Sequence, residues 1–279
     1  MSNSVQNAEN SLNQGKEMIE IKVLILAGGF GSRISEESHL RPKPMIEIGE
    51  MPILWHIMKI YSHYGFNDFV ILAGYKQHVI KEWFANYFLH TSDITFDFSN
   101  DKQEMIVHQK HAEPWKVTVV DTGLNTMTGG RVKRAREYVG DEAFMLTYGD
   151  AVGNINIPEL FEFHKRQGKI GTLSVYNFGQ DKGVLEVDKH GKVEAFREKS
   201  DLDGDLINIG FMVFEPQIFD YISDDMTVLE REPLNELVEL GELNAYLHKG
   251  FWQCMDTIRE KEKLEKLWAS ENCPWKEWT

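Results

Sequence analysis

The sequence is poor in cysteine, with only Cys254 and Cys273 among its 279 residues. Their spacing matches no zinc motif and no redox pair, which argues against a disulfide scaffold and against a cysteine-ligated metal module. So few cysteines are expected in a protein that is kept reduced. We therefore predict a cytoplasmic protein in which both cysteines serve as small apolar residues.

Long apolar runs are also missing, since no stretch approaches the roughly 20 residues that a membrane-spanning helix needs. The first residues are rich in Asn, Ser and Gln and contain no apolar segment of the kind found in signal peptides. We expect residues 1–20 to form a flexible tail and expect no membrane partner.

Positive charge is scarce, because 30 Lys and Arg face 44 Asp and Glu, and no block of like charges appears. A net charge of −14 repels nucleic acid, so a phosphate site must be a local cluster of cations that serves a small ligand. The length allows one large α/β domain or two small ones, and we favour one domain over residues 21–279.

The stretch from Lys22 to Pro44 combines an apolar run, Val23 to Leu26, with three glycines, Gly28, Gly29 and Gly31. The run predicts a strand buried on both faces, and the glycines leave backbone N–H groups free to face an anion. Their spacing fits neither the P-loop nor the dinucleotide fingerprint. Cations follow the turn, with Arg33 directly after it and Lys43 between two prolines, so both can share the charge of a polyphosphate.

Alternating strand and helix patterns follow the glycine turn. Apolar runs at 68–75, 117–123 and 143–150 are separated by helical patterns, which predicts a parallel sheet with ligands at its carboxyl edge. After Gly171 shorter segments with turn signals predict a mixed or antiparallel β-rich extension.

Two aspartates are open to two interpretations each, and one arginine differs from the cations that follow it. Asp150 directly follows a strand, where it could hold Mg²⁺ or simply form a turn. Asp256 precedes the last helix and could be a metal ligand or an N-cap. Arg131 follows Gly129 and Gly130, a pair that allows close approach, whereas Lys133, Arg134 and Arg136 on the same predicted helix are expected to face solvent.

Read in order, LAGGFGSR, RPKPMIEIG, PILWHIM, EPWKVTVVDTG, MTGGRVKR, TYGD and FWQCMDT resemble the sugar-phosphate nucleotidyltransferases. The resemblance runs from about Lys22 to the last residues, and the fourth, fifth and seventh motifs are most similar to the cytidylyl branch, the glucose-1-phosphate cytidylyltransferases or CDP-glucose pyrophosphorylases. It implies a Rossmann-like, mixed and mainly parallel sheet flanked by helices, with a nucleotide half over about 21–155 and a sugar-phosphate half over about 156–279.

The resemblance implies an enzyme that joins CTP and a hexose 1-phosphate, releasing pyrophosphate, with Mg²⁺ as cofactor. The catalytic residues would be Arg33, Lys43 and Asp150, and Asp150 with Asp256 would hold the metal. Glu198, Lys199 and Asn208 would meet the sugar phosphate. The nucleotide would be bound by Leu26, Ala27, Gly28, Gly29, Phe30, Gly31, Ser32, Arg33, Lys43, Thr126, Arg131 and Gly149. Similar enzymes are homo-oligomers and supply CDP-sugars for cell-surface polysaccharide.

This sequence departs from the family pattern at two positions. Ser200 stands where the family usually has proline, and Ile209 stands where it commonly has glycine. Ile209 reshapes the sugar pocket if it faces the sugar and changes nothing if it faces the core. The residue that reads cytosine stays unassigned, because Glu113 could serve that role or could brace the turn at Pro114 and Trp115.

Three alternatives stay open at this stage. A nicotinamide oxidoreductase is disfavoured because the second predicted strand ends in Gly74 and Tyr75 instead of an acid. A binding module or regulatory paralogue without turnover has no need of the combined set of Arg33, Lys43 and two aspartates. A related enzyme that uses UTP or dTTP, or a modified sugar phosphate, would share most of these motifs.

Overall fold

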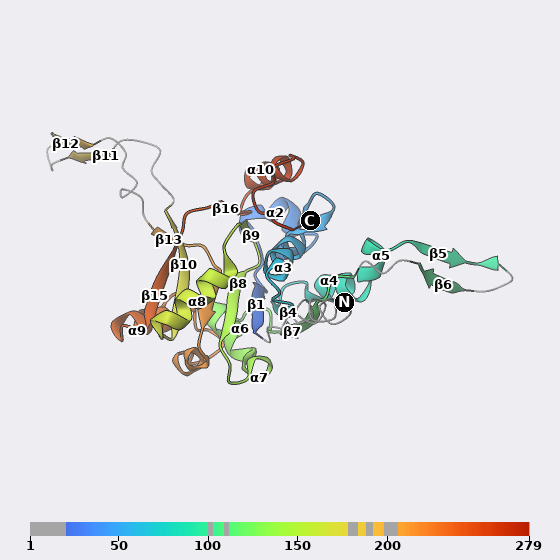
Figure 1. Ribbon diagram of the computed structural model, residues 1–279, viewed down its shortest axis with the longest axis horizontal. Helices are drawn as coiled ribbons and strands as arrows, with labels where there is room; N and C mark the ends of the chain where they lie inside the picture. Colours follow the sequence, from blue (N-terminus) through green and yellow to red (C-terminus); the bar gives the residue numbers. More distant parts are fainter. Residues whose placement is uncertain are drawn as a thin grey trace, which may run out of the picture.

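A sheet of eight strands forms the centre of the molecule (Figure 1). The computed structural model describes residues 21–99, 103–108, 112–177, 184–187, 192–197 and 206–278. The strand order is β13-β10-β14-β8-β1-β4-β7, with β15 paired to β10. The strands are β1 (Lys22–Ala27), β4 (Asp68–Ala73), β7 (Lys116–Asp121), β8 (Phe144–Tyr148), β10 (Gly171–Asn177), β13 (Leu206–Asn208), β14 (Met212–Phe214) and β15 (Leu243–His248).

The sheet is mixed, as the sequence predicted. β1 is parallel to β4 and β8, β4 is parallel to β7, and β15 is parallel to β10. The antiparallel pairs are β14 with β8 and β10, and β13 with β10. The β-rich segment after Gly171 thus continues the same sheet through β10, β13, β14 and β15.

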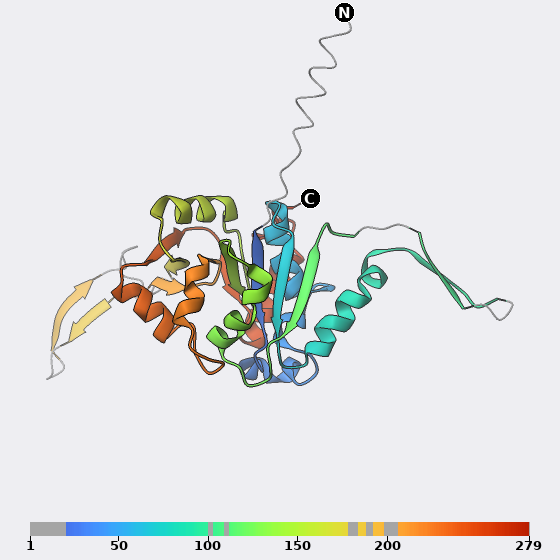
Figure 2. The same cartoon turned by 90° about the horizontal axis from the view of Figure 1, so that it is seen from below.

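Both faces of β1 are buried, because its side chains alternate between two apolar clusters. Val23 and Ile25 belong to one cluster and Leu24 to the other. The first cluster includes residues of α3 (Ile53–His63) and α10 (Ile258–Trp268), and the second includes residues of α6 (Thr128–Arg134) and α9 (Glu232–Glu239). Figure 2 shows the blue β1, cyan β4 and green β7 side by side, with helices packed around the sheet. Burial on both faces explains why the run reads as uninterrupted apolar sequence instead of an alternating one.

Helices connect the parallel strands and cover the sheet. The α-helices are α2 (Ser35–Ser38), α3 (Ile53–His63), α4 (Gln77–Ala85), α5 (Tyr87–Thr91), α6 (Thr128–Arg134), α7 (Arg136–Val139), α8 (Ile157–Gln167), α9 (Glu232–Glu239) and α10 (Ile258–Trp268). The 3₁₀ turns are η1 (Ser32–Ile34), η2 (Lys43–Met45) and η4 (Pro216–Tyr221). The helical patterns expected between the apolar runs are confirmed as α4 and α5 in the first interval and as α6 and α7 in the second.

Among the described residues, four small two-stranded sheets accompany the central one. They are β2 (Glu47–Ile48) with β3 (Met51–Pro52), β5 (Ile94–Asp97) with β6 (Glu104–Val107), β9 (Ala151–Gly153) with β16 (Trp252–Cys254), and β11 (Val184–Val187) with β12 (Val193–Arg197). The β5–β6 and β11–β12 hairpins project from opposite sides of the body (Figure 1).

Several predictions concern residues that the structure does not describe. The tail, residues 1–20, and the two sugar-phosphate residues Glu198 and Lys199 lie outside the described residues. Across the described part of the chain, no helix combines the length and the apolar character needed to cross a bilayer.

Candidate functional site

A cavity of about 550 Å³ lies at the carboxyl ends of β1 and β8. Four segments contribute to it: the glycine turn after β1, the η2 turn, the loop that leads into α6, and the turn after β8. Its lining residues are Leu26, Ala27, Gly28, Gly29, Phe30, Gly31, Ser32, Arg33, Lys43, Pro44, Leu124, Asn125, Thr126, Met127, Thr128, Arg131, Tyr148, Gly149, Asp150 and Met226. Every residue predicted to bind the nucleotide is therefore in this one cavity.

The glycine turn needs glycine for two separate reasons. Gly31 has φ of +66°, a left-handed conformation that residues with a Cβ rarely adopt. At Gly28 the reason is space, because a Cβ there would lie 2.1 Å from Nη1 of Arg131. A Cβ at Gly29, by contrast, would meet nothing within 4 Å. The turn thus lets Arg131 reach the backbone of the cavity wall.

Arg131 is buried between two backbone segments. A Cβ at Gly74, after β4, would also collide with the guanidinium, at 2.4 Å. Nη1 donates to Thr122 Oγ1 at 2.6 Å and to the Gly123 carbonyl at 2.7 Å, and Nη2 donates to the Leu124 carbonyl at 3.2 Å. Burial lowers the pKa of Arg131, yet arginine stays charged at neutral pH. The cavity wall therefore presents a fixed cation.

Lys43 lies between the two aspartates that the sequence singled out. Its Nζ donates to Oδ2 of Asp150 at 2.7 Å and to Oδ1 of Asp256 at 2.5 Å. Burial alone would lower the pKa of Lys43, but the attraction of the two carboxylates outweighs it and the pKa is raised. Since both distances end at the same nitrogen, Asp150 and Asp256 are close neighbours.

Strand pairing explains how two residues so far apart in sequence meet. Asp150 comes directly before β9, and Asp256 follows β16 by two residues. β9 and β16 pair antiparallel with Ala151 opposite Cys254, and the Met255 N–H donates to the Asp150 carbonyl at 2.8 Å. Arg33 is a second cation beside this pair of aspartates, with its Nη1 2.6 Å from Oδ2 of Asp256.

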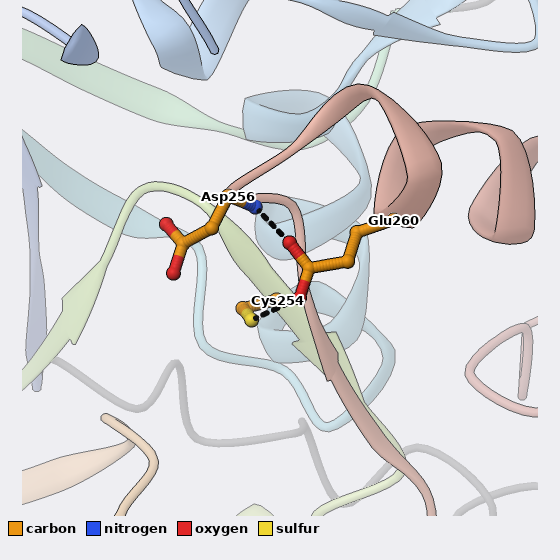
Figure 3. Close-up of side chains that lie close together, drawn as sticks. All are labelled: Cys254, Asp256 and Glu260. Carbon is orange, nitrogen blue, oxygen red and sulfur yellow. Dashed lines mark hydrogen bonds between the residues drawn. The ribbon is translucent and has the colours of Figure 1, made fainter. Parts of the chain in front are cut away.

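The start of α10 directs Asp256 toward the cavity. Thr257, and not Asp256, is the N-cap of α10, and it forms a capping box with Glu260. Figure 3 shows the Asp256 carboxylate pointing away from Glu260, whose Oε2 accepts from the Asp256 N–H at 2.7 Å. The competing N-cap interpretation of Asp256 is therefore wrong, and its carboxylate is available to Lys43 and Arg33.

Cys254, Asp256 and Glu260 form a cluster of potential metal ligands, but its chemistry argues against a metal site (Figure 3). Glu260 is engaged in capping, and the Cys254 thiol donates to its Oε1 at 3.5 Å. Burial, followed by the nearby carboxylates Glu260 and Asp256, raises the pKa of Cys254 to about 12, so the thiol stays protonated. A metal-ligating cysteine is a thiolate.

Asn208 reaches the edge of the cavity through Tyr148. Its Nδ2 donates to the Tyr148 hydroxyl at 3.2 Å, and its Oδ1 accepts from the Gly210 N–H at 3.0 Å. Ile209 points the other way and is 1% exposed within the apolar core. The structure thus selects the core-facing alternative for Ile209, so this departure from the family pattern does not reshape the pocket.

The glycine pair before Arg131 has a packing role. A Cβ at Gly129 would lie 2.8 Å from the Thr227 carbonyl, and one at Gly130 would lie 2.5 Å from the Asp225 carbonyl. The pair therefore lets α6 approach the 225–229 segment, and the close approach expected there is to protein backbone.

The three cations that follow Arg131 are not in the cavity. Lys133 donates to the Ile222 and Ser223 carbonyls, while Arg134 and Arg136 pair with Asp225 and Asp220. All three side chains bind the 220–225 segment. The expectation that they face solvent is therefore right in that they lie outside the cavity and wrong in that they have protein partners. Glu113 pairs with Lys59 at 2.7 Å and is absent from the cavity lining.

A family model described as Nucleotidyl transferase matches residues 22–254, which is most of the chain. The chain belongs to the nucleotidyl transferase family. It is therefore a nucleotidyltransferase, and the cavity at the carboxyl ends of β1 and β8 is the candidate active site of this enzyme.

Individual proteins agree with that assignment. Over 92% of its length the nucleotidyltransferase is 52% identical to the whole of the glucose-1-phosphate cytidylyltransferase of Salmonella typhimurium. It is 42% identical, with the same coverage, to a probable glucose-1-phosphate cytidylyltransferase of Bacillus subtilis.

Two solved structures show the same fold. HddC from Yersinia pseudotuberculosis superposes with a TM-score of 0.64 at 20% identity, covering 89% of this chain and 99% of HddC. A UDP-glucose pyrophosphorylase complexed with UDP-glucose gives 0.63 at 14% identity, covering 89% of this chain and 98% of that one. At such identities the likeness concerns the fold alone.

Some cavity residues of this nucleotidyltransferase were not identified from its sequence. Tyr148 stands directly before Gly149 and Asp150, so its position at the end of β8 could have indicated it. Thr128 begins the helix that carries Arg131. Met226 comes from the loop between η4 and α9, which bears no motif, and only the folded chain brings it to the cavity.

Proposed function

We propose that this nucleotidyltransferase joins CTP and α-D-glucose 1-phosphate, or a closely related hexose 1-phosphate, to give CDP-glucose and pyrophosphate. The carrying observation is that Lys43 binds both Asp150 and Asp256 beside a glycine-lined cavity that also contains Arg33 and Arg131. The names of the 52% and 42% identical relatives support the choice of substrates.

The donor set at Asp150 and Asp256 suits Mg²⁺. Both ligands are carboxylates, which magnesium prefers, and the β9–β16 pairing brings them together at the cavity. The ammonium of Lys43 already shows that a positive charge is stabilised between them. We propose that these two residues hold Mg²⁺, which when bound would offset phosphate charge and orient the triphosphate.

The chain's own residues then have to bring two anions together. An oxygen of the sugar phosphate attacks the α-phosphorus of CTP in line, and pyrophosphate leaves. Gly28 to Gly31 offer backbone N–H groups to the triphosphate, and Arg33 and Lys43 offset its charge. The attacking phosphate is already ionised at neutral pH, so no general base and no covalent nucleophile are required.

The sugar-phosphate side is assigned to Glu198, Lys199 and Asn208. The contact of Asn208 with Tyr148, a cavity residue, supports its part of this assignment. For Lys199 we expect that Lys199→Ala raises the KM for the sugar phosphate strongly and the KM for CTP much less. Equal effects on both would remove Lys199 from the sugar-phosphate site.

Arg131 supports the choice of cytosine. A guanidinium has five N–H donors, and three hydrogen bonds to the protein are formed here. Cytosine offers adjacent acceptors at O2 and N3, which match two remaining donors, whereas uracil and thymine carry an N–H at N3 that would oppose them. We therefore propose Arg131 as a reader of the base.

The proposed function is tested by measuring pyrophosphate release with Mg²⁺ across CTP, UTP, dTTP and GTP, each combined with glucose, mannose and galactose 1-phosphates. We expect CTP with glucose 1-phosphate to give the highest kcat/KM. A preference for UTP or dTTP would overturn the assignment of the base. Tight CTP binding without release from any pair would indicate a binding module without turnover.

We further propose that the protein is a homo-oligomer, on the basis of the β5–β6 hairpin. Ile94 faces Val107 and Phe96 faces Met105 across the strands, so these four side chains share one face. The rings of Phe96 and Phe98 stack with centroids 6.4 Å apart, and both are exposed. An apolar two-stranded hairpin is only marginally stable in water unless something covers it, and we propose a second copy of the chain.

The mass of the protein in solution tests the proposed homo-oligomer. We expect sedimentation to give a multiple of the 32.3 kDa chain and Phe96→Ser with Met105→Ser to lower it, while Glu104→Gln on the opposite face leaves it unchanged. A wild-type mass of one chain would contradict the proposal. The cytoplasmic location and the role in polysaccharide synthesis stay predictions.

A further inference from the structure

Glu230 connects two walls of the cavity without lining it. Its Oε2 accepts from the Thr128 hydroxyl at 2.6 Å, and its Oε1 accepts from the Tyr148 hydroxyl at 2.8 Å. Both partners line the cavity, Thr128 from the start of α6 and Tyr148 from the end of β8. One carboxylate thus joins helix α6 to the end of strand β8.

On one side this link fixes the start of α6. The Thr128 hydroxyl donates to Glu230 and also accepts from the Leu229 N–H at 2.9 Å. The N-cap of α6, Met127, makes no side-chain capping bond. Thr128 is one turn before Arg131 on the same helix, so the Glu230 contact bears on the position of the proposed base reader.

On the other side the link fixes the end of β8. Tyr148 is two residues before Asp150, and its hydroxyl accepts from Asn208 while it donates to Glu230. Hydrogen bonds therefore run continuously from Asn208 through Tyr148 and Glu230 to Thr128. This series of hydrogen bonds connects the proposed sugar-phosphate side of the cavity with the proposed nucleotide side.

We propose that Glu230 is a positioning residue that holds the nucleotide wall and the sugar-phosphate wall of the cavity at a fixed separation. This inference rests on the proposed function, in which the two substrates must meet in line. In such a reaction a displacement of about 1 Å can lower the rate about 100-fold. Removing Glu230 leaves the ligand-binding residues of each wall in place. The expected loss of rate therefore comes from a changed placement of the two substrates relative to each other.

Glu230→Ala therefore lowers kcat for CTP and glucose 1-phosphate by about 10- to 100-fold. The affinity for CTP, measured by calorimetry without sugar phosphate, changes much less than kcat, because Arg131 keeps its hydrogen bonds to Thr122, Gly123 and Leu124. Glu230→Gln keeps an acceptor oxygen and recovers part of kcat. Glu236→Gln, an exposed glutamate of α9, is the matched control and leaves kcat unchanged.

A mutant cycle distinguishes positioning from a general loss of structure. Thr128→Val and Tyr148→Phe are combined in the wild-type and Glu230→Ala backgrounds. Both hydroxyls donate to Glu230, so the effects of the two substitutions on kcat/KM should depend on each other when Glu230 is present. We expect the double variant to differ from the product of the single effects by at least about fivefold with Glu230 and not to differ without it. Coupling that persists in Glu230→Ala, or a Glu230→Ala kcat within twofold of wild type, would overturn the proposal.

Hydrogen exchange tests the link independently of turnover. Glu230→Ala raises exchange in 128–134 and in 145–150 together, whereas Glu236→Gln raises it in neither. Unchanged exchange in both segments overturns the inference even if the enzyme acts on CTP. A wild-type protein without turnover contradicts the proposed function, and the exchange result then decides the structural link by itself.

Discussion

Lys43 Nζ lies 2.7 Å from Oδ2 of Asp150, although 107 residues separate the two in sequence. The same ammonium binds Asp256, so one lysine spans the two carboxylates that we propose for the metal. When a metal binds there, Lys43 has to exchange these partners for the triphosphate. Several expectations depend on this relationship.

Metal binding should depend on both aspartates. With Mn²⁺ as a probe, Asp150→Asn and Asp256→Asn should each weaken binding in the presence of CTP by about 10- to 100-fold, because one of the two protein ligands is lost. Asp141→Asn, an exposed residue before β8, should have no effect. The free Mn²⁺ signal in electron paramagnetic resonance measures this, and unchanged affinity in either site variant would remove that residue from the metal site.

Two adjacent glycines offer a matched test of Arg131. Gly28→Ala places a methyl group 2.1 Å from Nη1 of Arg131, so the guanidinium must move away, whereas Gly29→Ala meets nothing within 4 Å. Because hydrogen bonds from a charged group contribute about 1.5–3 kcal/mol, we expect Gly28→Ala to weaken CTP binding about 10- to 100-fold. Calorimetry should find Gly29→Ala close to wild type, and equal losses in both would show that Arg131 is not the cause.

Burial of His56 should make stability depend on pH. Burial lowers the pKa of His56 to about 4, while the hydrogen bond to the Ile48 carbonyl opposes this. The unfolded chain therefore takes up the proton first as the pH falls. The contribution of neutral His56 to the free energy of unfolding is therefore fully present above about pH 6.5 and is lost as the pH falls toward 4. The total loss is about 3 kcal/mol.

Denaturant unfolding of His56→Gln should test this contribution. We expect a free energy of unfolding that changes less between pH 6.5 and 4.5 than in the wild type. His63→Gln, on the exposed side of the same helix, should keep the wild-type slope. Parallel curves for wild type and His56→Gln would contradict the buried neutral form.

The cluster in Figure 3 should behave as a helix cap and not as a metal site. Glu260→Ala removes the acceptor for the Asp256 and Thr257 N–H groups, which should lower the free energy of unfolding by about 1 kcal/mol. Cys254→Ser should leave Mn²⁺ affinity unchanged. A loss of affinity in Cys254→Ser would place sulfur in the metal site.

The strands that carry the site could be predicted from the sequence, whereas several contacts between its side chains could not. The apolar run before Gly28 and the strand before Asp150 are local patterns, so their strands and the cavity at their carboxyl ends were predictable. The meeting of Asp150 with Asp256 came from the family resemblance, because the β9–β16 pairing that causes it joins distant segments.

Other features depend on tertiary contacts alone. Ile209 could have faced either side, and only the packed sheet shows that it is in the core. The packing role of Gly129 and Gly130 and the link made by Glu230 each depend on a partner that no spacing reveals. The N-cap at Thr257, by contrast, has a spacing signal in the sequence, because Glu260 follows it by three residues as in a capping box.

The most direct test of the account is pyrophosphate release from CTP and glucose 1-phosphate with Mg²⁺, compared between the wild type and Asp150→Asn. We predict release by the wild type and a kcat reduced at least about 100-fold in the variant, with CD spectrum and melting temperature close to wild type. Near-normal kcat in Asp150→Asn would contradict the proposed role of this aspartate. No release by the wild type would contradict the proposed reaction itself.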